Sequence, residues 1–481
     1  MLDISIGRVE GLPAKEMAQL MKLLDVYRSH RAKNRLKNKY YEGHVTLGDV
    51  NLGIALPRGF RGLEIGCSWG AKCVDVLAGR SMFDGFVAES GKDATAMREI
   101  LMDNNLVYEY SKACRDELKY GCTFATLSHG GMSGARIRWH TPQTAAAIWD
   151  GENDRIECGF AVIAVEEDPN SKISVIKIIN LYTSEATWVL RHVKHSDFIA
   201  EQVPHMHGEP LMVPFIWNAT SEKPFGRSRL KKSIRELIDS YVRTVANATI
   251  GLEFATSPQK YLLGVTDDQY DAVVSQKFRQ YIGSILASTP NPETGQNPAF
   301  GQLPQGNIQP HVEMLRILAT QFSAATGLTV TDVGVVNDAN PTSSDAILAQ
   351  SQTLVVMAEQ LNYGNGNALR HLALLAKAIA SNIPVDRLND YQRNVLAHFR
   401  NPAMPSVSVT ADAAIKIASA RAEFASTDTF LEMIGFDQAD IRRIKAQESR
   451  ARGQALLTEE FSNADISGGL EPIYQPAGQS K

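Results

Sequence analysis

Hydrophobic side chains recur every three or four residues over several stretches of the N-terminal third, and this spacing predicts amphipathic helices. Residues 13–43 form the first such stretch, with Pro13 suited to the first helical turn. Two further helical patterns cover residues 69–81 and 92–121, and the second ends near Gly121. The apolar positions of the first stretch are Met17, Leu20, Met21, Leu24 and Tyr27.

Between residues 122 and 217 the hydrophobic pattern changes to a period of two, which is typical of half-buried strands. Segments 135–141, 157–168 and 174–192 show the alternation most clearly. The sequence DPNSK at 168–172 predicts a hairpin turn between the last two segments. This part of the chain is therefore predicted to be rich in antiparallel strands.

Helical spacing returns at residues 227–255, which contain no glycine or proline before Gly251. At 1.5 Å per residue such a helix would span roughly 40 Å. A short strand at 259–265 and a short helix at 268–281 are predicted next, followed by a loop rich in proline, glycine and asparagine at 288–307.

The last part of the chain is again mainly helical. A helix is predicted from about 309 to 326, and residues 328–342 cannot be helical throughout. A very long helical pattern covers 343–381, and a final helical block covers 411–458. The tail from Ser462 onward is rich in Gly, Pro, Ser and Gln, so it is expected to be disordered. These patterns predict an α+β fold that is mainly helical.

Composition limits the class of protein. A chain of 481 residues exceeds the usual size of one hydrophobic core, so two or more domains are expected. Its net charge of -4 argues against wholesale wrapping of nucleic acid, but not against contact with DNA that is not held tightly. The five cysteines form no C-x-x-C motif, so neither a disulfide framework nor a zinc site is expected. Neither a signal peptide nor a membrane span is expected.

One short segment matches two enzyme motifs. GCSWG at 66–70 fits the nucleophile elbow of hydrolases, and HGGM at 129–132 is similar to their oxyanion loop. The longer segment GLEIGCSWG at 62–70 resembles a cofactor loop of methyltransferases that bind S-adenosylmethionine. The elbow needs a preceding buried strand, the oxyanion loop should come before it, and Trp69 would fill a cofactor loop. We therefore expect Trp69 to begin a helix and pack in a core, and we expect no catalytic, cofactor-binding or metal-binding residue.

Other candidate chemistry is weaker. His205 and His207 share a strand face if that segment is extended, but no cysteine or carboxylate pattern completes a metal site. The chain has no phosphate-binding loop of the ATPase type, so it contains no motor. The second half of the first predicted helix contains six basic residues. They could contact phosphate, or they could form a solvated face or a subunit contact. The residues are Arg28, Arg31, Lys33, Arg35, Lys37 and Lys39.

The order of the predicted elements is more informative than any motif. A single long helix is not stable alone in water, so each needs neighbours along its length. The helix at 227–255 and its partner at 309–326 are separated by the insertion 256–307. Copies of the same chain could supply the remaining packing, which indicates a ring.

At this level the chain resembles the portal proteins of tailed bacteriophages, specifically the siphophage type. The resemblance covers about residues 20–450 and is carried by short patterns in a characteristic order. Thr329 departs from the family by replacing a common proline. The patterns are YYEGH (40–44), W-x-x-x-x-V-D-V-L-A (69–78), FDGF (83–86), FGRSRLKKSIRELIDSYVRTVAN (225–247), GLEFATSPQKYLLG (251–264), FSAATGL (322–328), NPTSSDAILAQSQTL (340–354) and TADAAIKI (410–417).

The resemblance implies a fold of wing, stem, clip and crown, assembled as a ring that typically has twelve subunits. The implied parts are a wing at 1–226, stem helices at 227–255 and 308–327, a clip at 256–307, a tunnel loop at 328–342, a wing-spanning helix and crown at 343–460, and a disordered tail at 461–481. Two alternatives remain open, namely a methyltransferase or esterase, and a helical scaffold or adaptor without a channel.

The resemblance also implies a function without catalysis or cofactors. A portal sits at one capsid vertex of the virion after assembly in the host bacterial cytoplasm, and passes double-stranded DNA during packaging and ejection. Its implied partners are further copies of itself, the major capsid and scaffolding proteins, the large terminase subunit and a head–tail connector or adaptor protein, with no membrane.

Two sets of residues are expected to meet those partners. Those expected to contact a partner from the clip are Pro290, Asn291, Pro292, Phe300 and Gln302. Those expected to line the tunnel are Thr329, Val330, Thr331, Asp332, Val333, Val335, Val336, Asn337, Asp338 and Asn340. The tunnel set contains no lysine or arginine, and its two aspartates would either repel phosphates or hold neighbouring loops by hydrogen bonds.

Overall fold

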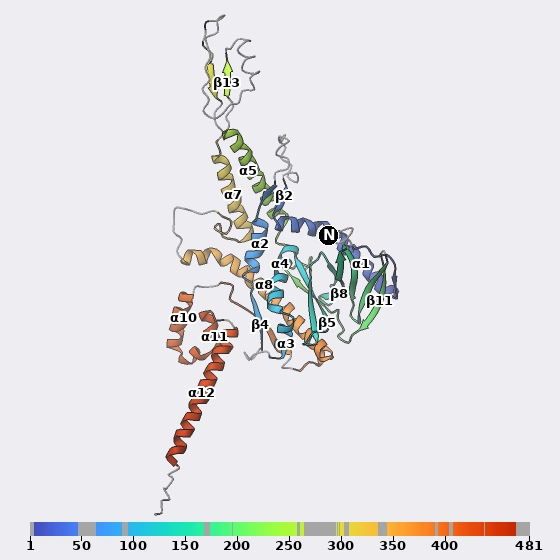
Figure 1. Ribbon diagram of the computed structural model, residues 1–481, viewed down its shortest axis with the longest axis vertical. Coiled ribbons are helices and arrows are strands. Elements are labelled where there is room, and N and C mark those ends of the chain that lie inside the picture. Colours follow the sequence, from blue (N-terminus) through green and yellow to red (C-terminus); the bar gives the residue numbers. More distant parts are fainter. Residues whose placement is uncertain are drawn as a thin grey trace, which may run out of the picture.

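The chain folds as a central body from which a pair of helices projects at one end and a single helix at the other (Figure 1). The computed structural model describes residues 4–46, 64–88, 95–167, 174–194, 196–256, 260–263, 295, 297, 299–302, 307–334, 344–389, 393–403, 407–436 and 438–467. No helix in these ranges is both long enough and apolar enough to cross a bilayer.

A six-stranded sheet forms one side of the body. Its order is β1-β11-β10-β9-β8-β7, and every neighbouring pair is antiparallel except β1 with β11. The predicted β-rich segment is thereby confirmed, although the turn expected at 168–172 lies outside the described residues. The strands are β1 (Val9–Glu10), β7 (Ala145–Asp150), β8 (Arg155–Glu167), β9 (Ser174–Tyr182), β10 (Ala186–Lys194) and β11 (Asp197–Pro204).

Helix α1 (Ala14–Tyr41) covers one face of this sheet and confirms the first predicted helix. Its Leu20, Leu23 and Leu24 are fully buried between the helix and the sheet. Each such side chain contributes about 1.5–3 kcal/mol to stability relative to an exposed one. The Tyr27 ring meets Phe160 of β8 edge to face at 6.0 Å. The amphipathic spacing read from the sequence thus corresponds to a separate core between helix and sheet.

A second, three-stranded sheet lies in the main core, in the order β12 (Met212–Ile216), β5 (Cys122–His129) and β6 (Ala135–His140). Helices α2 (Trp69–Ala78), α4 (Leu106–Tyr120) and α8 (Ser344–Ser381) pack into the same core. Short strands tie distant parts of the chain together: β4 (Phe83–Ala88) pairs with β15 (Val395–Phe399), and β2 (His44–Thr46) pairs with β3 (Glu64–Gly66).

The helical stretch predicted at 92–121 is two helices rather than one. Helix α3 (Thr95–Asp103) ends before α4, because Asn105 adopts a left-handed backbone with φ of 47°. Asn104 fixes the break: its amide nitrogen donates to the carbonyls of Ile100 and Ala135 at 3.0 Å, and its oxygen accepts from the Ile137 amide at 2.8 Å. The predicted end of α4 near Gly121, at φ 106°, is confirmed.

The C-terminal half contains the projecting elements. Helices α5 (Lys232–Thr256) and α7 (Gln309–Thr326) lie side by side, and their far end carries the hairpin of β13 (Lys260–Leu263) and β14 (Ala299–Gln302) (Figure 1). The strand predicted at 259–265 is confirmed, but β14 lies within the stretch predicted as loop. The helix predicted at 268–281 lies outside the described residues.

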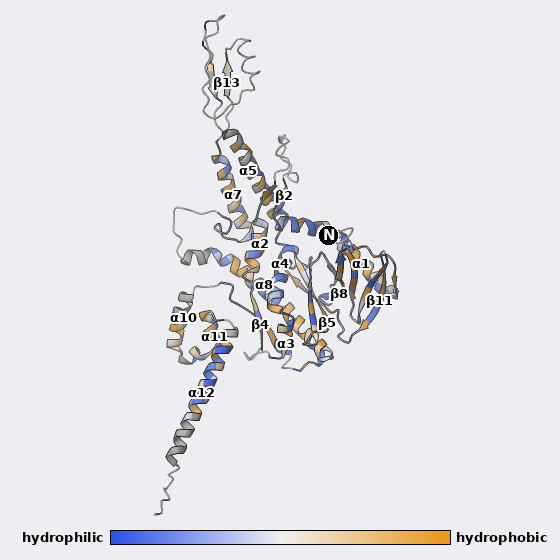
Figure 2. Cartoon of the chain, in the orientation of Figure 1, coloured by the Kyte–Doolittle hydropathy of each residue, from blue (hydrophilic) through white to orange (hydrophobic). Residues whose placement is uncertain are grey.

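Beyond α8 the chain forms a small helical group that ends in a long, largely hydrophilic helix (Figure 2). Its elements are a 3₁₀ helix (Val385–Arg387), α10 (Val407–Ala420), a second 3₁₀ helix (Ala422–Ser426), α11 (Asp428–Ile434) and α12 (Gln438–Ser467). His398 of β15 lies 3.6 Å from the carboxylate of Glu432 and links the group to the body. Helix α12 continues past residue 461, so the predicted disordered tail begins too early.

Candidate channel loop and stem junction

The two projecting helices pack through apolar side chains one turn apart. In α5, Ile234, Ile238 and Val242 lie at intervals of four residues and are at most 3% exposed. In α7, Leu318 and Phe322 are equally buried. Residues four apart lie on one face of a helix, so this spacing gives each helix an apolar side that faces its partner. The helix pair expected at 227–255 and 308–327 is present, with α5 beginning at Lys232.

Helix α7 ends in a short glycine-terminated turn. Gly327 adopts φ of 73°, a left-handed conformation that costs least for glycine, and its N–H donates to the Ser323 carbonyl. The Ser323 hydroxyl donates to the Leu328 carbonyl at 2.6 Å, which directs the chain back over the helix end. A Cβ on Gly327 would meet the Met357 sulfur at 3.2 Å, so the turn is pressed against α8.

Thr329 and Asp332 close the next turn. The amide and hydroxyl of Thr329 both donate to Oδ2 of Asp332, at 3.0 and 2.8 Å, and the Asp332 amide lies 3.2 Å from the Thr329 hydroxyl. This carboxylate therefore stabilises a turn of its own chain, a role that the two sequence-based alternatives for Asp332 did not include. Val333 is half-buried and packs against the main core of its own subunit.

Only the first part of the predicted tunnel segment can be placed. Thr329 to Gly334 form the turn, in which Thr331 is exposed and Val330 is half-buried. Five predicted tunnel residues lie outside the described ranges: Val335, Val336, Asn337, Asp338 and Asn340. Helix α8 starts at Ser344, close to the predicted start at 343.

A buried arginine joins the elements beneath this turn. Arg229 is 6% exposed, and its Nε donates to the Cys73 carbonyl of α2 at 2.7 Å. Its Nη2 donates to the Thr326 carbonyl at the end of α7 at 2.7 Å, and its Nη1 lies 3.5 Å from the Met357 sulfur of α8. A guanidinium holds its donors in a rigid planar fork and can reach carbonyls on different sides at once, a geometry that the compact ammonium of a lysine lacks. Sequence reasoning missed this residue.

Trp69 explains the segment that resembled an enzyme motif. Its ring lies 4.3 Å from Tyr241 of α5 and 4.7 Å from Phe322 of α7, measured between ring centroids. Ser68 is the exposed residue before α2, and the preceding strand β3 has three residues and pairs only with β2 in the described part of the chain. Neither a nucleophile elbow nor a doubly wound parallel sheet has this context. GCSWG instead anchors the body to the two projecting helices.

Comparison with known proteins then decides the family. A family model described as "Phage portal protein, SPP1 Gp6-like" matches residues 17–454 of the 481-residue chain. The chain belongs to the phage portal protein family.

Among solved structures, this portal protein is similar to chains of gene transfer agent particles. A chain of "Virion of native gene transfer agent (GTA) particle" is 12% identical, with a TM-score of 0.45 over 76% of this chain and 89% of that one. A chain of "Neck of native GTA particle computed with C12 symmetry" is 11% identical, with a TM-score of 0.44 over 76% and 89%. No curated protein matches the portal sequence.

The titratable groups of the portal chain serve packing. Burial raises the pKa of the Cys67 thiol to about 11 and of the Cys122 thiol to about 12, which keeps both protonated and unreactive. The rings of His205 and His207 lie 5.7 Å apart, and burial lowers the pKa of both. Within the described ranges no cluster of three or more His, Cys, Asp or Glu could hold a metal ion.

The basic run in α1 is partly internal. Lys37 donates to the Tyr120 carbonyl at 2.6 Å, and burial lowers its pKa. Arg28, Lys33 and Arg35 are exposed. In the hairpin, Phe300 pairs with Leu262 across the two strands. Gln302 pairs in the same ladder, whereas Pro290, Asn291 and Pro292 lie outside the described residues.

Proposed function

We propose that the portal protein forms a closed ring of twelve subunits whose stem helices surround a channel for double-stranded DNA at one capsid vertex. Helices α5 and α7 are the stem and the β13–β14 hairpin belongs to the clip. Residues 1–226 form the wing, α8 spans the wing, and the helical group after it is the crown. The turn at Thr329–Gly334 begins the tunnel loop.

The observation that carries this proposal is the uncovered apolar surface of the stem. Met314 and Ile317 of α7 are 42% and 51% exposed, on the same helix whose Leu318 and Phe322 are buried against its partner. Val356 and Tyr363 of α8 are 43% and 78% exposed. Large apolar side chains that are left exposed are candidates for an interaction site, and a second copy of the chain offers a stem on either side.

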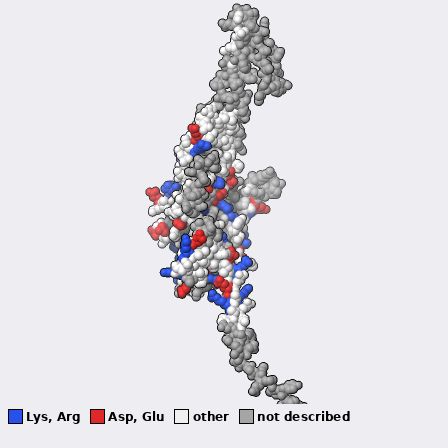
Figure 3. All heavy atoms as spheres, turned by 90° about the vertical axis from the view of Figure 1, so that its left-hand side faces the viewer, with Lys and Arg blue, Asp and Glu red and all other residues white. Residues whose placement is uncertain are grey.

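The distribution of charge suits a conduit. In the view of Figure 3, positive and negative side chains are interspersed over the body, and no continuous basic stripe is visible. The chain has no lysine or arginine between residues 317 and 334. Each phosphate contact adds salt-dependent affinity, so a channel without a continuous basic stripe lets DNA slide rather than hold.

The remaining assignments follow from the portal role. The clip, which includes Phe300 and Gln302, is proposed to contact the large terminase subunit during packaging and the head–tail connector afterwards. The wing is proposed to contact the major capsid and scaffolding proteins. The protein would be assembled in the bacterial cytoplasm, remain in the virion, and act without catalysis or a cofactor.

Native mass spectrometry of the purified protein tests the ring. Twelve-subunit species with an axial channel in negative-stain images are expected. Replacing Met314 and Ile317 together by glutamate should leave monomers or small oligomers, because each subunit contact would then bury unpaired charges against apolar surface. As a matched control, Ile199 and Val203, exposed apolar residues of β11, are replaced by glutamate and the rings should persist. Monomers and dimers in the wild type at every concentration would refute the proposal.

A further inference from the structure

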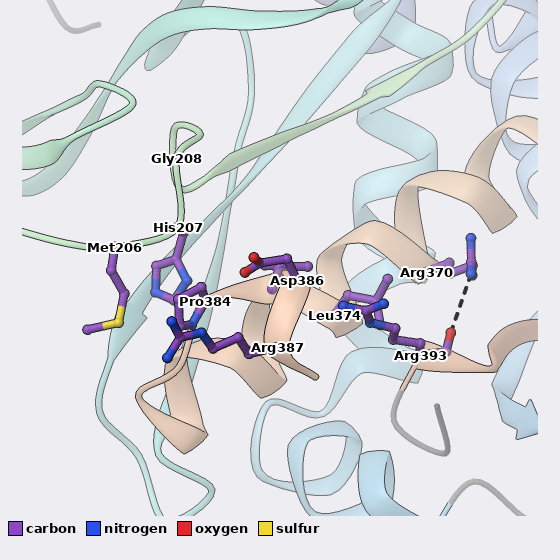
Figure 4. Close-up of a pocket in the computed structure, with 10 residues that line it drawn as sticks. Met206, His207, Gly208, Arg370, Leu374, Pro384, Asp386, Arg387 and Arg393 are labelled. Atoms are coloured by element: carbon purple, nitrogen blue, oxygen red, sulfur yellow. Dashed lines mark hydrogen bonds between the residues drawn. The ribbon is translucent and has the colours of Figure 1, made fainter. Parts of the chain in front are cut away.

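A solvent-open pocket with a volume of about 670 Å³ lies where the C-terminal part of α8 meets the connection between β11 and β12. Figure 4 shows its lining: Arg387 extends toward Met206 and His207 at one end, and Arg370 and Arg393 lie together at the other. The end of α8 lies on the side of the body away from the stem (Figure 1). This pocket is separate from the stem junction and the tunnel loop.

Positive charge is concentrated in this pocket. Three arginines line it, and Asp386 is the single carboxylate among its lining residues. The ion pairs between described residues include none of these arginines. Arg370 is positioned by donating Nη2 to the Arg393 carbonyl at 3.3 Å, which leaves the rest of its guanidinium for a ligand. Arg370 and Arg387 are exposed and Arg393 is half-buried.

Apart from His207 and Gly208, the rest of the lining is apolar. Leu374, Pro384, Val385 and Met206 surround the charged groups. A guanidinium binds a carboxylate through two parallel hydrogen bonds, and apolar walls favour a ligand that carries hydrocarbon between its anionic groups. A duplex is too wide to enter such a pocket, and its backbone offers no apolar side chains to these walls.

We propose that this pocket binds an acidic peptide segment of a partner protein, with glutamate or aspartate side chains on the arginines and interleaved apolar side chains on Leu374, Pro384 and Val385. Every residue of this lining belongs to one chain. Asp386 fixes the position of the peptide along the pocket, because it repels an acidic side chain directly opposite itself.

Fluorescence anisotropy of the full-length protein tests the pocket. The probe is a fluorescein-labelled peptide of alternating glutamate and leucine, and its counterpart has glutamine in place of glutamate. Saturable binding of the acidic probe is expected, with much weaker binding of the glutamine probe. The double substitution Arg387→Gln and Arg393→Gln should weaken binding by about a hundredfold, about tenfold for each lost charge-assisted contact. The charge-matched control, Arg28→Gln with Arg35→Gln on α1, should bind as the wild type does.

Four outcomes separate the alternatives. Asp386→Asn should tighten binding of the acidic probe, because a repulsive charge is removed. Equal weakening in the pocket and α1 variants would show general electrostatic attraction and overturn the site. Displacement of the probe by duplex DNA that depends on Arg387 and Arg393 would assign the pocket to nucleic acid instead. Loss of oligomers in the pocket variant, seen by native mass spectrometry, would mean that a second copy occupies it.

Discussion

Glu117 of α4 is fully buried in the main core beside α8, and its ionisation should make the stability of the portal protein depend on pH. Its Oε2 accepts a hydrogen bond from Nδ2 of Asn365 at 2.7 Å, and the same nitrogen donates to the Tyr110 hydroxyl at 2.9 Å. Burial raises the pKa of Glu117 from 4.5 to about 8, and the hydrogen bond from Asn365 offsets only part of this effect. The folded protein therefore keeps a proton that the unfolded chain releases.

The size of the effect follows from linkage. Between the two pKa values the native state binds more protons than the unfolded state, so stability falls as pH rises, by up to about 1.4 kcal/mol per pH unit. From about pH 6 to about pH 8 the loss should be about 2 kcal/mol, because titration of the native carboxyl reduces the slope near its own pKa. Glu117→Gln retains an oxygen acceptor for Asn365 without the charge. The stability of this variant should therefore not fall between about pH 6 and about pH 8 through this group.

Urea unfolding followed by tryptophan fluorescence, at the two pH values, measures the difference. The wild type should lose about 2 kcal/mol more than Glu117→Gln on going to the higher pH. Glu99→Gln, at an exposed position of α3, is the control and should keep the wild-type dependence. If the unfolding free energies of the wild type and Glu117→Gln changed in parallel with pH, the reasoning would be refuted, since Glu117 would then have its ordinary pKa in the native state.

Three further outcomes are expected. Arg229→Met should lower the unfolding free energy by about 3 kcal/mol, because two carbonyls lose a charged donor, whereas the exposed Arg227→Met should change it little. Equal effects of the two substitutions in calorimetry would contradict the structural role of Arg229. Asp332→Lys should slow DNA packaging into procapsids, most strongly at low salt. The control Asp332→Asn retains an acceptor for the turn and should package nearly normally. Wild-type rates for the lysine variant at two salt concentrations would place the loop away from DNA. Deleting residues 288–298 should spare the ring and impair packaging or head completion, and normal tailed particles would count against the clip assignment.

Much of the fold could be predicted because periodicity reports burial directly. The apolar repeat of α1 and the alternation from β5 to β12 each reflect one face packed on a core. The break at Asn104 and Asn105 could not be predicted, because it depends on hydrogen bonds to β6, which lies more than thirty residues further along the chain. The pairing of β14 with β13 was missed for a similar reason: a short strand among prolines and glycines has no periodicity of its own.

The candidate site was less predictable than the fold. The end of α7 at Gly327 was predicted correctly and the tunnel assignment stays a prediction, whereas the role of Asp332 depends on the threonine three residues before it. Arg229 stands in a run of basic residues that reads as a solvated helix start. Only the tertiary structure shows that this arginine, unlike Lys231 and Lys232, is buried. A single buried arginine among exposed cations leaves no signal in one sequence.

Arg229 and Asp332 together determine the sign of the charge that the end of α7 presents. The C-terminus of a helix carries a partial negative charge from its unpaired carbonyls, and Arg229 donates to one of them, that of Thr326, from within the core. Its positive charge is therefore used where solvent and DNA do not reach. Asp332 lies beyond the same helix end and is half-buried in the turn, in a stretch of chain, 317–334, that contains no lysine or arginine. If the ring places this turn in the channel, each subunit adds a fixed, weakly negative group, and the ring repels phosphate evenly from all sides instead of binding it at one.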